Sequence, residues 1–127
     1  MTDIPAADIL AKIRFTIRQA QTRWKPGKDT IHLTKRIALG HLPSQSTLVD
    51  YETTIRAILN SERGKVYLFY YQSQSPYPTV TAKIENSDWV VIINLDGTME
   101  TAFSPENLDD YLSDPAYKYV GLLDEFS

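Results

Sequence analysis

The 127-residue sequence predicts a single α+β domain over residues 1–127. Two N-terminal helices are expected to pack on an antiparallel meander of about four strands, followed by a short C-terminal helix. Three observations support this fold class. Apolar residues recur at helical spacing in two stretches before the first strand. Strand-length runs rich in Val, Ile, Tyr and Phe follow. Asp96-Gly97 separates two of these runs, and this pair favours a tight hairpin turn.

The first predicted helix covers residues 4–24. Asp3 can cap its start, and Pro26-Gly27 ends it. Spacings of three and four residues line up one apolar stripe, formed by Ile9, Ile13, Ile17, Ala20 and Trp24. We expect this stripe to face the sheet.

The second predicted helix covers residues 46–60. Thr47 and Asp50 have the spacing of a capping box, with Asp in place of the preferred Glu or Gln. The apolar stripe of this helix consists of Leu48, Tyr51, Ile55 and Ile58 or Leu59. This pattern predicts a second helix with one face on the core.

The predicted strands cover residues 65–71, 79–85, 89–95 and 98–103. The first of them is apolar on both faces, which is typical of a central strand. The second alternates between apolar and polar residues. Turns at Asn86-Ser87 and Asp96-Gly97 join the last three strands into a meander. The short C-terminal helix is predicted to start at Ser104-Pro105, and the tail 117–126 is apolar enough to pack on the domain.

The composition narrows the chemistry that this chain can perform. It contains no cysteine and only two histidines, which excludes disulfides, thiolate zinc sites and histidine-rich metal sites. We therefore predict no cofactor, although a carboxylate site for magnesium stays open. No targeting signal is visible, and no apolar run approaches the roughly 18 residues of a membrane span. We expect a cytoplasmic protein that does not enter a membrane.

The net charge of −3 is unevenly distributed along the chain. Eight of the 13 basic residues lie in the first 36 positions, whereas ten acids and one base follow from Glu85 onward. One interpretation is an anionic partner at the basic end. The other is that acidic loops and a basic helix face only keep the protein soluble.

A candidate site lies between the two predicted helices, in His32-Leu33-Thr34-Lys35-Arg36. If this segment is helical, His32 shares a face with Lys35 or Arg36. Histidine exchanges protons near neutral pH, and the two cations can stabilise negative charge on a phosphodiester. The alternative is a surface histidine beside two solvated cations. His41 is either a second acid/base group or a loop residue.

Thr101, on the last predicted strand, is a further candidate because a hydroxyl can hydrogen-bond a phosphate. Threonine is also a common strand residue, which is the alternative explanation. Four tyrosines could stack on bases or belong to the core: Tyr67, Tyr70, Tyr71 and Tyr77.

The order of these features resembles the barnase/colicin/RelE-type ribonuclease superfamily over roughly residues 30–104. The resemblance lies in a helix, His-x-x-Lys-Arg, a second helix, and a meander that ends in Asp-Gly-x-x-x-Thr-Ala-Phe. Many members of this superfamily are toxin domains of bacterial conflict or phage systems. The resemblance implies that His32 is the base, that Lys35 and Arg36 lie beside it, and that Thr101 assists. The chain differs from such toxins in being acidic and in showing no delivery segment.

The sequence therefore predicts a toxin-like endoribonuclease that cleaves RNA without a metal, by attack of the 2′-hydroxyl. A standalone toxin and an inactive relative both fit the departures from the superfamily. RNA is one expected partner, and a protein that is antitoxin-like, immunity-like or of another kind is the other. The rival hypothesis, from another functional class, is a non-enzymatic interaction domain whose acidic C-terminal half binds a protein. The sequence leaves the RNA target and the oligomeric state open.

Overall fold

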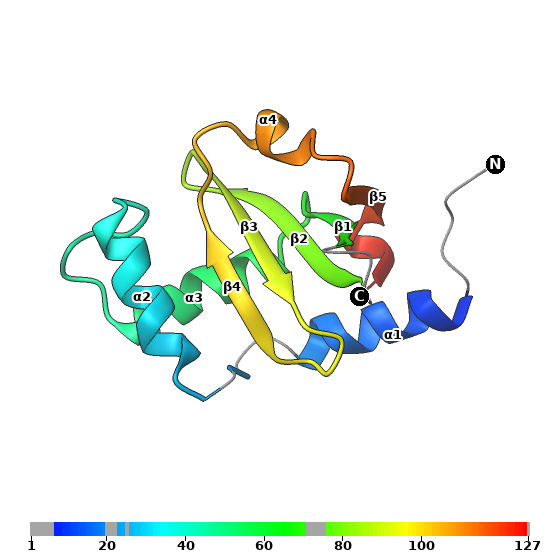
Figure 1. The fold of residues 1–127 in the computed structure, drawn as a ribbon, viewed down its shortest axis with the longest axis horizontal. Coiled ribbons are helices and arrows are strands. Elements are labelled where there is room, and N and C mark those ends of the chain that lie inside the picture. The colour runs from blue at the N-terminus through cyan, green and yellow to red at the C-terminus, as the bar shows by residue number, and fades with distance from the viewer. Residues whose placement is uncertain (1–6, 20–22, 25, 71–75, 127) are drawn as a thin grey trace.

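The computed structural model describes residues 7–19, 23–24, 26–70 and 76–126, and it confirms the α+β class (Figure 1). N-terminal helices precede a five-stranded antiparallel sheet, and a short helix interrupts the chain before the last strand. The elements are α1 (Ala7–Gln19), α2 (Lys28–Ala38), α3 (Leu48–Leu59), β1 (Lys65–Phe69), β2 (Tyr77–Ile84), β3 (Ser87–Ile93), β4 (Met99–Phe103), α4 (Leu108–Leu112), β5 (Tyr117–Leu122) and a 3-10 turn (Leu123–Phe126).

The N-terminal half contains one helix more than predicted, because residues 28–38 form α2. This helix gives weak signals in the sequence. It begins after Gly27, which has a φ of 81° and no side-chain cap, and Ile31 on its surface is 59% exposed. Only part of the helix packs on the core, through Leu33 and Ile37. Its position beside β4, at the edge of the sheet, explains why its apolar stripe is narrow (Figure 1).

Helix α1 buries the centre of its predicted stripe. Ile13 and Ile17 are 0% and 4% exposed. The side chains of Ile9 and Ala20 lie outside the described residues. Trp24, predicted in the same helix, instead forms an isolated bridge with Met99 of β4.

Helix α3 begins as its sequence predicts. The Thr47 side chain accepts a hydrogen bond from the Asp50 N–H, and the Asp50 carboxylate accepts one from the Thr47 N–H. Helix α4 begins later than predicted, because Asn107 is its cap and Ser104-Pro105 precedes it. The Ser104 hydroxyl instead donates to the Asp88 carbonyl at 2.6 Å.

The strands are arranged in the order β4-β3-β2-β1-β5. The meander and the hairpin at Asp96-Gly97 are confirmed, while the turn between β2 and β3 lies at Glu85-Asn86, one residue earlier than predicted. The C-terminal tail contributes a fifth strand, which pairs with β1. Strand β1 is therefore an interior strand, as its apolar faces predict.

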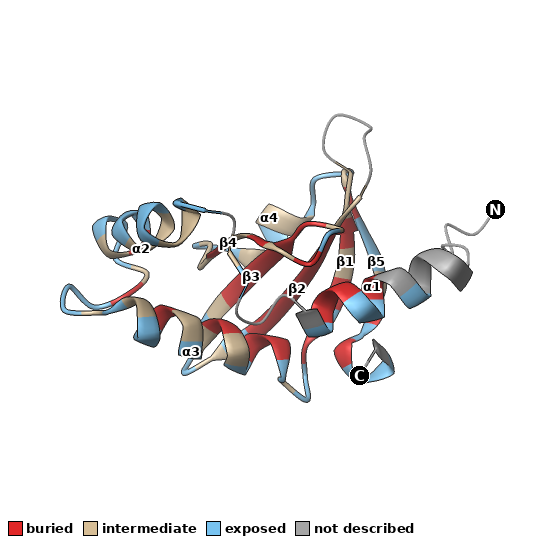
Figure 2. Cartoon of the chain, turned by 90° about the horizontal axis from the view of Figure 1, so that it is seen from below, coloured by how far each residue is buried: buried red, intermediate tan, exposed pale blue. Residues whose placement is uncertain are grey.

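The two faces of the sheet carry different cores. Val66, Val80, Val91 and Ala102 are paired in register and belong to the same core cluster as buried residues of α1 and α3. Figure 2 shows these two helices against the sheet. Phe69 stacks on Tyr117, and Tyr111 of α4 contacts Phe103 and Tyr117 on the other face. The helical face contains most of the aliphatic core, and the other face is aromatic.

The outer edge of β4 makes hydrogen bonds beyond the sheet. The Met99 N–H donates to the Arg23 carbonyl at 2.6 Å. The buried Tyr51 hydroxyl of α3 donates to the Ala102 carbonyl at 2.6 Å and accepts from the Ala102 N–H at 3.3 Å. An open edge strand is a template for aggregation, and these contacts together with α2 cover it.

Candidate functional site

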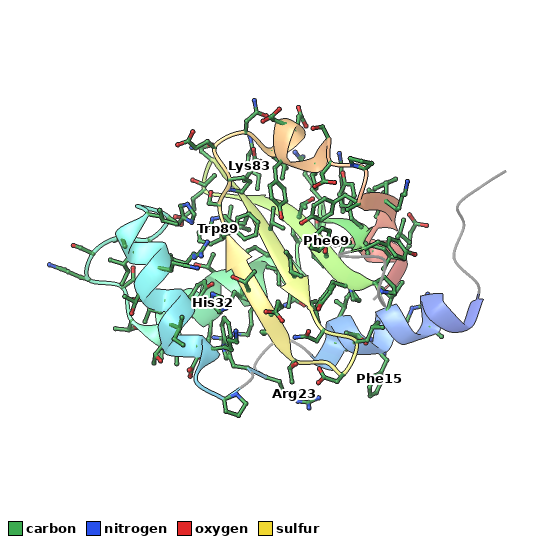
Figure 3. All side chains as sticks on the ribbon, in the orientation of Figure 1. Phe15, Arg23, His32, Phe69, Lys83 and Trp89 are labelled. Carbon is green, nitrogen blue, oxygen red and sulfur yellow. The ribbon has the colours of Figure 1, made fainter. Side chains whose placement is uncertain are left out.

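Helix α2 brings His32 against the outer edge of β4. The Nδ1 atom of His32 lies 3.2 Å from the Thr101 hydroxyl oxygen, across 69 positions of sequence. Figure 3 shows His32 between α2 and β4. Two of the four residues predicted for the site are therefore in hydrogen-bond contact, which their separation in the sequence did not guarantee.

The His32 ring is half-buried and sits against an aromatic ring. Trp24 stacks on it with ring centroids 6.1 Å apart and an interplanar angle of 29°. The Nε2 atom of His32 is buried and has no hydrogen-bond partner among the described residues. Burial is the main cause that lowers the pKa of His32 below 6.5, followed by the positive charges of Arg36, Lys28 and Lys35.

The predicted cations of α2 differ in their exposure. Lys35 is exposed, whereas Arg36 is 6% exposed. The Arg36 guanidinium lies over the Phe103 ring, 5.7 Å from its centroid, and its Nη1 is 3.4 Å from Nδ1 of His41. Arg36 is therefore part of the packing between α2 and β4, and Lys35 is the predicted cation that faces solvent.

His41 links α2 to the end of β4. Its Nδ1 accepts a hydrogen bond from the Ser104 N–H at 3.3 Å and lies within reach of Arg36 Nη1. Both partners are obligate donors, so Nδ1 carries a lone pair and the neutral ring has its proton on Nε2. Burial, and then the charge of Arg36, lower the pKa of His41 below 6.5. His41 is thus held in its neutral form.

Sequence reasoning missed two members of this site. Lys28 lies one helical turn before His32 and contributes to lowering its pKa. Its spacing from His32 would have indicated this role if α2 had been predicted. Tyr51 is predicted in the core, and it is fully buried, but its hydroxyl also hydrogen-bonds the backbone of Ala102, next to Thr101. Burial raises the pKa of Tyr51 to about 12, so its hydroxyl stays protonated.

The arrangement provides an acid/base group, a hydroxyl beside it and nearby positive charge. A neutral imidazole accepts a proton, and cations stabilise developing negative charge. Among the described residues, no group of three or more His, Asp or Glu is placed to hold a metal ion. In the same part of the chain, no helix is long and apolar enough to cross a bilayer.

Comparison of the chain with known protein families, with curated proteins and with solved structures returned no match.

The lowered pKa values predict how stability depends on pH. The unfolded chain binds protons at His32 and His41 near pH 6.5, whereas the folded chain resists this until a lower pH. We therefore expect full stability above pH 6.5 and a loss as the pH falls through 6.5 toward the folded-state values. Thermal unfolding between about pH 5 and pH 8 measures this effect.

The control for this prediction is the double variant His32→Asn with His41→Asn. Its melting temperature is expected to depend less on pH in this window, because both titrating groups are gone while carboxylates still titrate. The same slope in both proteins would contradict the lowered pKa values.

Proposed function

We propose that the chain is a metal-independent endoribonuclease that cleaves RNA through attack of the 2′-hydroxyl on the adjacent phosphodiester. The observation that supports it best is the 3.2 Å contact between His32 and Thr101. His32 lies on helix α2, which also carries three cations. The resemblance to the barnase/colicin/RelE-type superfamily supports the same assignment of these positions.

In this proposal, His32 is the general base. A base must be unprotonated, and the lowered pKa keeps His32 neutral at neutral pH. In the required tautomer Nδ1–H donates to the Thr101 hydroxyl, which leaves the lone pair on Nε2 to take the proton of the 2′-hydroxyl. The deprotonated oxygen forms a bond to phosphorus, the bond to the 5′-oxygen breaks as that oxygen takes a proton from water, and a 2′,3′-cyclic phosphate results. Because Nε2 is buried, the groups around it, Trp24 among them, have to move aside for the substrate.

The remaining residues have supporting roles. The exposed Lys35 and the half-buried Lys28 bind the phosphate. Arg36 was expected to share this contact, but with 6% exposure it acts through its charge and by fixing His41. The Thr101 hydroxyl orients the His32 ring through Nδ1.

The test is incubation of the purified protein with total cellular RNA in the presence of EDTA. Cleavage with 2′,3′-cyclic phosphate ends is expected, because none of the assigned steps uses a metal. Lys35→Ala should weaken RNA binding and lower the slope of log affinity against log salt by about one unit, since one phosphate contact is lost. Fluorescence anisotropy with a labelled single-stranded RNA measures this slope.

The matched control is Lys118→Ala, an exposed lysine on β5 outside α2. It should leave both the affinity and the salt slope unchanged. No cleavage and no measurable RNA affinity over several salt and pH conditions would refute the proposal. In that case the acidic C-terminal half becomes the candidate surface for a protein partner.

A further inference from the structure

A second feature of the molecule is a cavity of about 450 Å³ on the helical side of the sheet. It lies between the α2–α3 loop, the first turns of α3 and the β2–β3 turn, and its size falls in the range of small-molecule sites. Its lining combines apolar walls, hydroxyls and two carboxylates, and consists of His41, Leu42, Pro43, Gln45, Ser46, Asp50, Thr54, Ile84, Glu85, Ser87 and Trp89.

The lining has a definite hydrogen-bonding character. His41 uses Nδ1 for Ser104 and Arg36, which leaves its Nε2–H for the cavity. Asp50 accepts from the Thr47 N–H with Oδ2, so Oδ1 is the oxygen available for another donor. The described lining contains no lysine or arginine. The cavity is therefore unsuited to a phosphate and suited to a group rich in N–H donors.

The cavity is physically connected to the candidate catalytic site. Arg36 contacts His41, and Arg36 lies one helical turn after His32. The buried Arg36 thus joins α2, whose Lys28 and Lys35 are the cations with exposed surface, to the wall of the anionic cavity. A nucleotide also combines two such parts. Its charged phosphate suits the lysines of α2, and its neutral base presents hydrogen-bond donors and acceptors to the cavity.

We propose that this cavity is the subsite for a nucleobase with an exocyclic amino group. The proposal rests on the ribonuclease function proposed above and names the part of the RNA that it recognises. Adenine, cytosine and guanine each offer an amino group to Glu85 or Asp50 and a ring or carbonyl acceptor to the His41 Nε2–H. Uracil has no amino group and offers a single N–H donor, so it makes fewer hydrogen bonds to the two carboxylates. Leu42, Pro43 and Ile84 pack on the faces and edges of the base.

The test is titration of the 127-residue chain with AMP, CMP, GMP and UMP, followed by amide chemical shifts and dissociation constants. Inorganic phosphate alone is the probe for binding that involves only the α2 cations. We expect shifts at Glu85, Ser87 and Thr54, and an affinity about tenfold weaker for UMP than for the other three. Phosphate alone should shift only residues of α2.

Three variants locate the contacts. Glu85→Gln should weaken the three amino-bearing nucleotides about tenfold and reduce their advantage over UMP. His41→Asn places an acceptor near the position of Nδ1, so it should keep the melting temperature while removing the Nε2–H and weakening binding. Glu62→Gln, an exposed residue outside the lining, is the matched control and should change nothing.

The outcomes separate this proposal from the ribonuclease proposal, because a mononucleotide has no phosphodiester to cleave. Equal affinities for the four nucleotides, shifts confined to α2, or no binding would each overturn the subsite. If RNA is cleaved in these cases, the ribonuclease proposal stands alone. Preferential binding of the amino-bearing nucleotides without RNA cleavage would support the subsite and overturn the catalytic assignment.

Discussion

Ile13→Asp is expected to lower the free energy of unfolding by about 3 kcal/mol or more. Ile13 is 0% exposed and belongs to the core on the helical face of the sheet. The substitution removes an aliphatic side chain from this core and forces a carboxylate to be buried or helix α1 to detach. Urea unfolding followed by circular dichroism measures the change, and a shift of the midpoint at constant slope would show that stability has changed.

Phe15→Asp is the matched control for this prediction. Phe15 lies two residues further along α1 and is 61% exposed, so the same new charge stays in water. Its effect should remain within about 0.5 kcal/mol, as for most surface substitutions. If Ile13→Asp and Phe15→Asp have equal effects, α1 does not pack on the sheet through Ile13.

The fold was predictable where a local signal and its tertiary environment agree. The capping box at Thr47 and the hairpin at Asp96-Gly97 depend on residues close in sequence, and both occur as predicted. Helix α2 and strand β5 were missed because contacts with other parts of the chain, rather than their own residue patterns, stabilise them. Helix α2 packs beside an edge strand with only part of its surface buried, and β5 forms because β1 offers it an edge.

The candidate site was predictable in its residue types but only partly in its geometry. The pairing of His32 with Thr101 followed the expected order of elements. The burial of Arg36 did not, because an arginine beside a lysine in sequence gives no sign that a phenylalanine ring and His41 hold it. The double role of Tyr51 was hidden in the same way, since tyrosine fits an apolar stripe equally well.

The site also has a structural role that competes with the catalytic one. Polar side chains of α2, α3 and their connecting loop satisfy groups along the outer edge of β4: Tyr51 at Ala102, His32 at Thr101 and His41 at Ser104. Such contacts protect an edge strand whether or not they catalyse a reaction. The decisive experiment must therefore separate the hydrogen bond that His32 makes from the proton that it transfers.

His32→Ala is expected to reduce RNA cleavage by about a hundredfold or more, because a positioned acid/base group contributes a factor of roughly 10² to 10⁴ to the rate.

The variant His32→Asn separates the hydrogen-bonding role of His32 from its role in proton transfer. An asparagine amide can reach Thr101 from nearly the position of Nδ1, 3.2 Å away in the wild type, but it has no group that accepts a proton at neutral pH. We therefore expect His32→Asn to retain the melting temperature and RNA affinity while losing as much cleavage as His32→Ala. Initial rates on a labelled RNA, with unfolding temperatures measured on the same samples, make this comparison. If His32→Asn cleaves at the wild-type rate, His32 only holds α2 to β4, and the general base must lie elsewhere.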